Sequence, residues 1–160
     1  MGVYGDAALS LDEGDAFAGS ASGKVEVNTV GANSLEAGLQ YNVDVTSVGG
    51  TLYTWAAFVK SSGAKEINWK PELAAGPWTA HAGQMQASTA KWADYYVEFT
   101  PAADVAPASL TLRIQADDED VWIDNARWYE GSYVPGDTGA PTAVEAVGKA
   151  TTTWGAIRTR

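Results

Sequence analysis

Acidic side chains gather in one short stretch near the end of the sequence. Four consecutive acids, Asp117 to Asp120, lead into an aromatic segment, VWIDNARWYEG, and Asp124 lies inside that segment. Two carboxylates that face each other across a cleft would suit the hydrolysis of a glycosidic bond. Asp118, Asp120 and Asp124 do not form a regular set at alternate strand positions with suitable neighbours. We therefore predict no catalytic residue, and a protein that is not an enzyme.

The two parts of this acidic stretch call for different interpretations. A block of like charges usually belongs to a solvated loop, and the chain supplies no cations next to Asp117–Asp120, so we expect these four acids to face water. Asp124 is a carboxylate in an apolar segment, where it needs either a charge partner or hydrogen-bond donors. A turn cap, or a set of backbone donors, would satisfy it equally well.

The remaining residue types exclude several kinds of chemistry. His81 is the only histidine and cysteine is absent, so a Ser-His-Asp triad, a multi-histidine metal site and a thiolate site have no support. The net charge of -10 argues against nucleic acid as a partner, because phosphate binding needs a basic face. It also disfavours docking on anionic lipid.

The elements that must position these residues are short strands. Apolar and polar residues alternate with a period of two in six segments, which is typical of half-buried strands. Turn-forming Gly, Pro, Ser and Asp separate the segments, and no helix of useful length is predicted. We expect an all-β fold, a two-sheet antiparallel β-sandwich of the jelly-roll kind. The six segments are 23–30, 39–48, 51–60, 65–73, 94–101 and 109–116.

The organisation along the chain is simple. We expect one β-sandwich domain over residues 1–133 and a linker with a C-terminal tail over 134–160. The amino-acid composition changes after Tyr133, where Pro, Gly, Asp and Thr follow. No apolar stretch of about 18 residues is present, so no membrane span is predicted. The opening residues show neither a charged n-region nor an apolar h-region, so a signal peptide is not visible.

The polar phase of the predicted strands collects side chains that form hydrogen bonds. If these strands belong to one sheet, their polar side chains form one concave surface that is rich in hydrogen-bond donors. Alternatively, they form an ordinary sheet face that contacts only solvent. Trp78 follows Gly-Pro among polar residues and is a candidate for an exposed aromatic platform, whereas Trp69 is ambiguous. The polar-phase residues are Gln40, Asn42, Asn68, Lys70, Glu72, Tyr96, Arg113 and Gln115.

The order of four segments resembles a known family. GGTLYTWAAFVKSSG, KWADYYVEFTP, SLTLRIQ and VWIDNARWYEG follow one another as landmarks do in carbohydrate-binding modules of the families four, nine and twenty-two type. The resemblance covers roughly residues 8–131, and its most specific part is the closing WIDNARWYEG. It implies a jelly roll that binds a polysaccharide or oligosaccharide on a concave sheet face without catalysis.

The resemblance also gives expectations for the site and the context. We expect a secreted monomer whose parent protein carries a glycoside hydrolase domain. The alternative is a structural or adhesion domain of a surface protein without glycan affinity. Arg113 would alternatively recognise a uronate or sulfate through charge-assisted bonds. Stacking is expected from Trp78, Trp69 or Tyr96, and hydroxyl contacts from Arg113, Gln115, Gln40 and Asn42.

A structural calcium ion is a further implication of the resemblance. In this family the Asp of Ile-Asp-Asn commonly ligates a calcium that ties the last strand to the N-terminal loop, which here makes Asp124 the ligand. Asp12 and Ser20, in LDEGDAFAGSASG, are the partners we expect. Calcium accepts carboxylate and carbonyl oxygens with flexible geometry.

Overall fold

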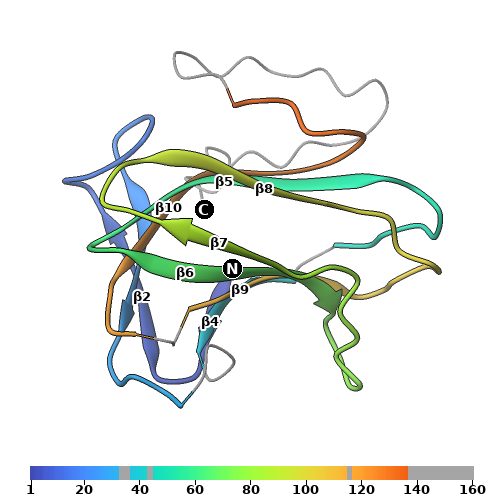
Figure 1. Ribbon diagram of the computed structural model, residues 1–160, viewed down its shortest axis with the longest axis horizontal. Helices are drawn as coiled ribbons and strands as arrows, with labels where there is room; N and C mark the ends of the chain where they lie inside the picture. Colours follow the sequence, from blue (N-terminus) through green and yellow to red (C-terminus); the bar gives the residue numbers. More distant parts are fainter. Residues whose placement is uncertain (33–36, 43–44, 115–116, 137–160) are drawn as a thin grey trace, which may run out of the picture.

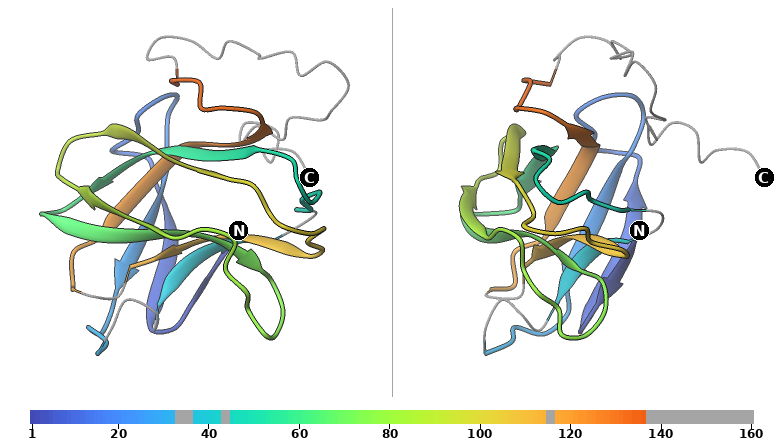
Figure 2. Two further views of the ribbon diagram at one scale, coloured as in Figure 1. Left: turned by 45° about the vertical axis from the view of Figure 1, so that its right-hand side comes forward. Right: turned by 90° about the vertical axis from the view of Figure 1, so that its right-hand side faces the viewer.

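The computed structural model describes residues 1–32, 37–42, 45–114 and 117–136. Ten strands and no helix are found in these residues, and the strands form two antiparallel sheets of five strands each that pack face to face (Figure 1; Figure 2). The predicted two-sheet β-sandwich is therefore confirmed. Among the described residues no helix is long and apolar enough to cross a membrane.

Strands that are distant in the sequence alternate within each sheet. The first sheet, called sheet A, has the order β1-β4-β9-β6-β7, and sheet B has the order β2-β3-β10-β5-β8. The strands of sheet A are β1 (Gly2–Tyr4), β4 (Gly38–Tyr41), β9 (Ala108–Arg113), β6 (Lys65–Leu73) and β7 (Gln84–Ser88). Those of sheet B are β2 (Ala7–Asp12), β3 (Ser22–Val27), β10 (Val121–Glu130), β5 (Tyr53–Ser61) and β8 (Ala93–Phe99).

Each of the six predicted segments contains a strand, β10 is the last strand that the resemblance implied, and β1, β2 and β7 were not predicted. All three are edge strands whose residues, apart from Ser88, are exposed or partly exposed, so these residues need not alternate between apolar and polar. The segment 39–48 is interrupted, because β4 ends at Tyr41. Val45, further along the same segment, lies beside the start of β9, where its carbonyl accepts the Ala108 N–H at 2.8 Å.

The core lies between the two sheets and is built from the apolar phase of the long strands. Trp69 of β6 is 0% exposed, and its ring packs against that of Trp55 in β5, with ring centroids 4.8 Å apart. The prediction that Trp69 stacks on a sugar is therefore wrong. Trp69 shares the inward phase of β6 with Ile67, and an inward side chain cannot reach the surface.

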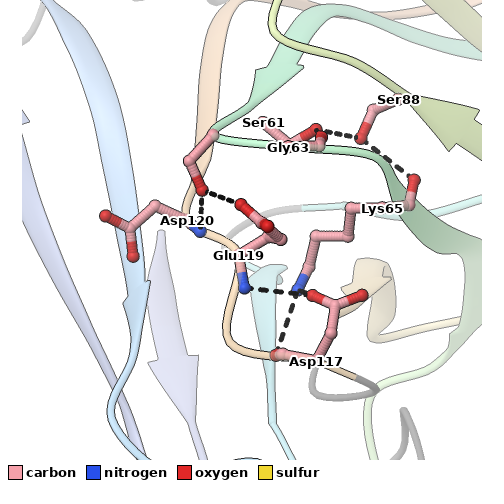
Figure 3. A network of polar contacts seen from close by, with 8 residues as sticks. Ser61, Gly63, Lys65, Ser88, Asp117, Glu119 and Asp120 are labelled. Carbon is pink, nitrogen blue, oxygen red and sulfur yellow. Dashed lines mark hydrogen bonds and ion pairs between the residues drawn. The ribbon is translucent and has the colours of Figure 1, made fainter.

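The acidic run is only partly the solvated block that its composition suggested, because Asp118 is exposed but the other three acids have partners. Lys65, whose side chain is fully buried, pairs with the Asp117 carboxylate, and Lys24 Nζ lies 2.9 Å from Asp120 Oδ2. Glu119 accepts a hydrogen bond from the Ser62 hydroxyl. Figure 3 shows the contact of Lys65 with Asp117 in the same network. The cations come from β6 and β3, far away in the sequence, so local composition did not reveal them. These contacts fix the segment 117–120, which leads into β10, to the neighbouring strands.

The chain after β10 folds back over the outer face of sheet B. The rings of Tyr133 and Tyr96 stack with centroids 3.7 Å apart and an interplanar angle of 5°. The Gly136 N–H donates to Asp94 Oδ2 at 2.7 Å. The orange segment above β5 and β8 in Figure 1 is this return. Residues 134–136 of the predicted linker therefore contact the domain, while 137–160 lie outside the described residues.

Candidate functional site

Polar side chains lie in rows across the outer face of sheet A. Leu39, Trp69 and Leu112 point into the core, so their neighbours along each strand point outward. Strand register gives one row of Tyr4, Gly38, Arg113, Asn68 and Met85. The next row is Gln40, Thr111 and Lys70, and a third pairs Ser109 with Glu72. The sheet thus brings Gln40, Asn68, Lys70, Glu72 and Arg113 onto one surface, here called the polar face.

Gly38, on β4 in the first row, lets an aromatic ring from the neighbouring edge strand lie across the sheet. A Cβ at Gly38 would lie 2.6 Å from the Tyr4 hydroxyl and 2.4 Å from the Leu112 carbonyl oxygen. Tyr4 therefore passes over β4 towards Arg113 on β9, and the nearby guanidinium favours the ionised phenol less strongly than burial opposes it. Burial raises the pKa of the Tyr4 phenol, so its hydroxyl stays protonated. Sequence reasoning missed Tyr4, because a three-residue strand shows no alternation.

Gly38→Ala is expected to destabilise the protein by about 1–3 kcal/mol, because the added methyl overlaps backbone as well as the Tyr4 ring. Gly2→Ala is the matched control on the neighbouring strand, since nothing lies within 4 Å of its Cβ position. Urea denaturation of both variants measures the difference. Equal stabilities would contradict the close approach of Tyr4 to β4.

An ion pair occupies the middle of the polar face. Arg113 Nη2 lies 2.8 Å from Glu72 Oε2, and the side chains are only 14% and 4% exposed. The pair spans the position of Thr111, which is fully buried. Charges so well covered require partners, and each supplies the other.

Two polar atoms beside this pair have no hydrogen-bond partner among the described residues. Arg113 Nε is a donor and Asn68 Oδ1 is an acceptor, and the two residues are register partners on adjacent strands. Most buried polar atoms are paired, so each such exception needs a physical reason. A hydroxyl group both donates and accepts, and so suits a donor next to an acceptor.

Trp78 is displayed at one end of the polar face. It lies in the connection between β6 and β7, is 56% exposed, and has a φ of 58°, which a bulky side chain rarely adopts. The predicted exposure of Trp78 is confirmed. Asn42 is exposed immediately after β4, and Gln115 lies outside the described residues.

Tyr96 is not on the polar face, contrary to our prediction. It belongs to β8, at the edge of sheet B, where it faces outward beneath the ring of Tyr133. Alternation correctly placed Tyr96 on the surface. Alternation cannot say which of two sheets a strand joins, and this is why the prediction was wrong.

The N-terminal loop is tied to sheet B around Asp124. Asp124 Oδ2 accepts the Ala18 N–H at 2.9 Å, and its Oδ1 accepts the Asn125 N–H at 2.7 Å. Asp12 accepts the Trp122 indole N–H at 2.7 Å and the Gly14 N–H at 2.8 Å. These donors satisfy both carboxylates. In the described ranges, no three His, Cys, Asp or Glu side chains gather into a metal-binding group.

A lysine supplies a positive charge to the same loop. Lys60 Nζ pairs with Asp15 and lies 4.5 Å from the ring centroid of Trp122. Hydrogen bonds from Lys60 and then Trp92 lower the pKa of the Asp15 carboxyl, and the Trp122 indole lowers that of Asp12. Their stabilising effect is therefore present at neutral pH and is lost as the pH falls through these lowered pKa values.

The fold is that of several solved modules. A xylan-binding family 22 module of Paenibacillus barcinonensis Xyn10C has a TM-score of 0.64 at 13% identity, over 83% of this chain and 86% of that one. The N-terminal cellulose-binding domain of Cellulomonas fimi β-1,4-glucanase C has a TM-score of 0.59 at 18% identity, over 82% and 89%. The chain has the fold of carbohydrate-binding modules. No protein-family model and no curated protein sequence match it.

One similar carbohydrate-binding module was solved together with an enzyme module. The family 22 and GH10 modules of Clostridium thermocellum endo-1,4-β-D-xylanase 10B, in complex with xylohexaose, match with a TM-score of 0.62 at 17% identity. The match covers 84% of this chain and 27% of that one. The likeness is therefore to a part of that larger protein.

Proposed function

We propose that this protein is a non-catalytic module that binds a polysaccharide on the polar face of sheet A. The observation that carries the proposal is the unpartnered Arg113 Nε beside the unpartnered Asn68 Oδ1, at the centre of that face. Sugar hydroxyls satisfy such a donor and acceptor together. The fold shared with carbohydrate-binding modules supports the same function.

The side chains around this centre supply the other contacts of a glycan. Tyr4 lies across the face and Trp78 projects at its end, and aromatic rings stack on the C–H faces of sugars. Glu72 neutralises the charge of Arg113, which favours a neutral polysaccharide over a uronate or a sulfated one. Gln40, Asn42 and Lys70 would contact hydroxyl groups.

Trp78→Ala is expected to lower the affinity for the bound polysaccharide about tenfold, through loss of stacking. Stability should change by less than about 0.5 kcal/mol, because the side chain is largely exposed. Leu11→Ala, an equally exposed apolar residue on sheet B, is the control. Isothermal titration calorimetry measures the affinities. An unchanged affinity in Trp78→Ala would show that Trp78 does not stack on the polysaccharide.

A hydrolase and an adhesion domain are the competing functions. On the polar face Glu72 is engaged by Arg113, so it is not available as one of two facing carboxylates. We therefore expect no release of reducing ends from any polysaccharide. Absence of binding across a broad glycan panel would favour a structural or adhesion domain.

The context of the module follows from the same proposal. We propose that the module is a secreted monomer and that its parent protein carries a glycoside hydrolase domain. In the xylanase described above, a module of similar fold is joined to a GH10 module. A tethered binding module raises the local concentration of substrate for its enzyme.

A calcium ion at the N-terminal loop stays a prediction. If Asp124 ligates an ion together with Asp12 and Ser20, EDTA lowers the melting temperature and added calcium restores it, because a ligand that binds only the native state stabilises it. Differential scanning calorimetry measures the change. An unchanged melting temperature would leave the loop attached by the hydrogen bonds of Asp12, Asp15 and Asp124 alone.

A further inference from the structure

A hollow lies at one end of the sandwich, apart from the rows of the polar face. Its volume is about 420 Å³, within the range of small-molecule sites. One wall is Thr79, Ala80 and His81, which lead into β7, and the other is the β8–β9 connection, residues 100–105. Both walls lie at the right-hand end of the molecule in Figure 1 and in the left view of Figure 2.

Backbone hydrogen bonds hold both walls in place. The Leu73 N–H donates to the Thr79 carbonyl, and the His81 N–H donates to the Pro71 carbonyl, each at 2.9 Å. Across the hollow, Val105 exchanges two backbone hydrogen bonds with Ser47, at 2.8 and 3.0 Å. The hollow is thus preformed, and a ligand would bind without first ordering a loop.

The lining matches one face of a neutral sugar ring. Most of it is apolar or small, from Ala80 and the Pro-Ala-Ala segment 101–103, and suits a C–H surface. His81 Nε2 is buried and has no hydrogen-bond partner among the described residues. None of the described lining residues is a lysine or an arginine, and Asp104 Oδ1 already accepts the Gly49 N–H at 2.8 Å. An uncharged ligand with a hydroxyl group fits this set best.

The hollow continues from the polar face. Ala80 forms a β-bridge with Glu72, which pairs with Arg113 at the centre of that face. The exposed Trp78 lies two residues before Ala80 on the same connection. A glycan on the polar face would therefore meet Trp78 and then the hollow.

We propose that the hollow binds the terminal sugar residue of a glycan chain whose interior lies on the polar face. The inference rests on the proposed function and adds recognition of a chain end. His81 Nε2 bonds a hydroxyl of the terminal ring, and the exposed Ala102 and Ala103 contact its C–H face.

Two variants test the hollow without touching the polar face. His81→Ala removes the hydrogen bond, and Ala102→Phe fills the space from an exposed lining position, with Ala102→Ser as its matched control. The probes are xylohexaose, cellohexaose and the corresponding long polymers, xylan and a soluble cellulose derivative. Calorimetry measures the hexasaccharides, and native affinity gels measure the polymers.

Both variants should lower hexasaccharide affinity about tenfold and leave polymer retention unchanged, because long polymers present few ends. Ala102→Ser should behave as the wild type. Unchanged hexasaccharide affinity in both variants would overturn the inference, and an equal loss for polymer and hexasaccharide would show an interior subsite instead. If the wild type binds no probe, the proposed function itself fails for these glycans.

Discussion

Asp94→Ala is expected to lower the free energy of unfolding by about 3–5 kcal/mol. The Asp94 carboxylate accepts two hydrogen bonds from Arg127 Nη2, at 2.6 and 2.8 Å, and one each from the Tyr133 hydroxyl and the Gly136 N–H, both at 2.7 Å. Arg127 Nε and Nη1 are buried without a partner among the described residues. Without Asp94, the guanidinium would be a buried charge with no counter-charge.

The same substitution should free the segment 131–136 from sheet B. Burial, and then the hydrogen bond to Asp94, raise the pKa of the Tyr133 phenol, so at neutral pH its hydroxyl serves as a donor to this carboxylate. Hydrogen exchange of residues 131–136 should therefore accelerate together with the loss of stability.

Glu98→Gln is the matched control for Asp94→Ala. Glu98 is exposed and, among the described residues, accepts a hydrogen bond only from the Tyr133 N–H, so its change should cost less than about 1 kcal/mol. Guanidinium denaturation compares the two variants. Equal losses would mean that Asp94 is not the centre of this contact.

Arg113→Met has the second large effect, on both stability and binding. Glu72 is almost fully buried, and removing Arg113 leaves its charge unpaired, at a cost of about 3–5 kcal/mol. Glycan binding should be lost, because the variant also lacks the Nε donor at the centre of the polar face.

A double variant separates these two effects. Replacing both Arg113 and Glu72 with Met leaves no buried charge, and such replacements are often neutral or stabilising. Most of the lost stability should therefore return, whereas glycan binding should not. Recovery of binding in the double variant would show that Arg113 acts only by satisfying Glu72.

The polar face could be predicted from the sequence because it depends on local alternation. Each polar residue of this face is next in sequence to an apolar residue that points into the core, and this alone fixes the side of the sheet on which it lies. These residues are Gln40, Asn68, Lys70, Glu72 and Arg113. The same signal also indicated the exposed position of Tyr96, but sheet membership depends on pairing between distant strands.

Features that depend on distant contacts were missed. The role of Gly38 depends on Tyr4, which is 34 residues away on an unpredicted strand. Asp117 and Asp120 looked solvated because Lys65 and Lys24 reach them only in the folded chain. The hollow near His81 is formed by two connections, whose shapes do not follow from residue periodicity.

The polysaccharide-binding role of sheet A is the central claim, and retention in native affinity gels tests it most directly. Wild type and the Arg113→Met/Glu72→Met variant would be run through gels that contain xylan, soluble β-glucans or a uronate polymer. We expect at least one neutral polysaccharide to retard the wild type, and none to retard the folded double variant. Equal retardation of both proteins, or of neither across the whole panel, would contradict binding on the polar face.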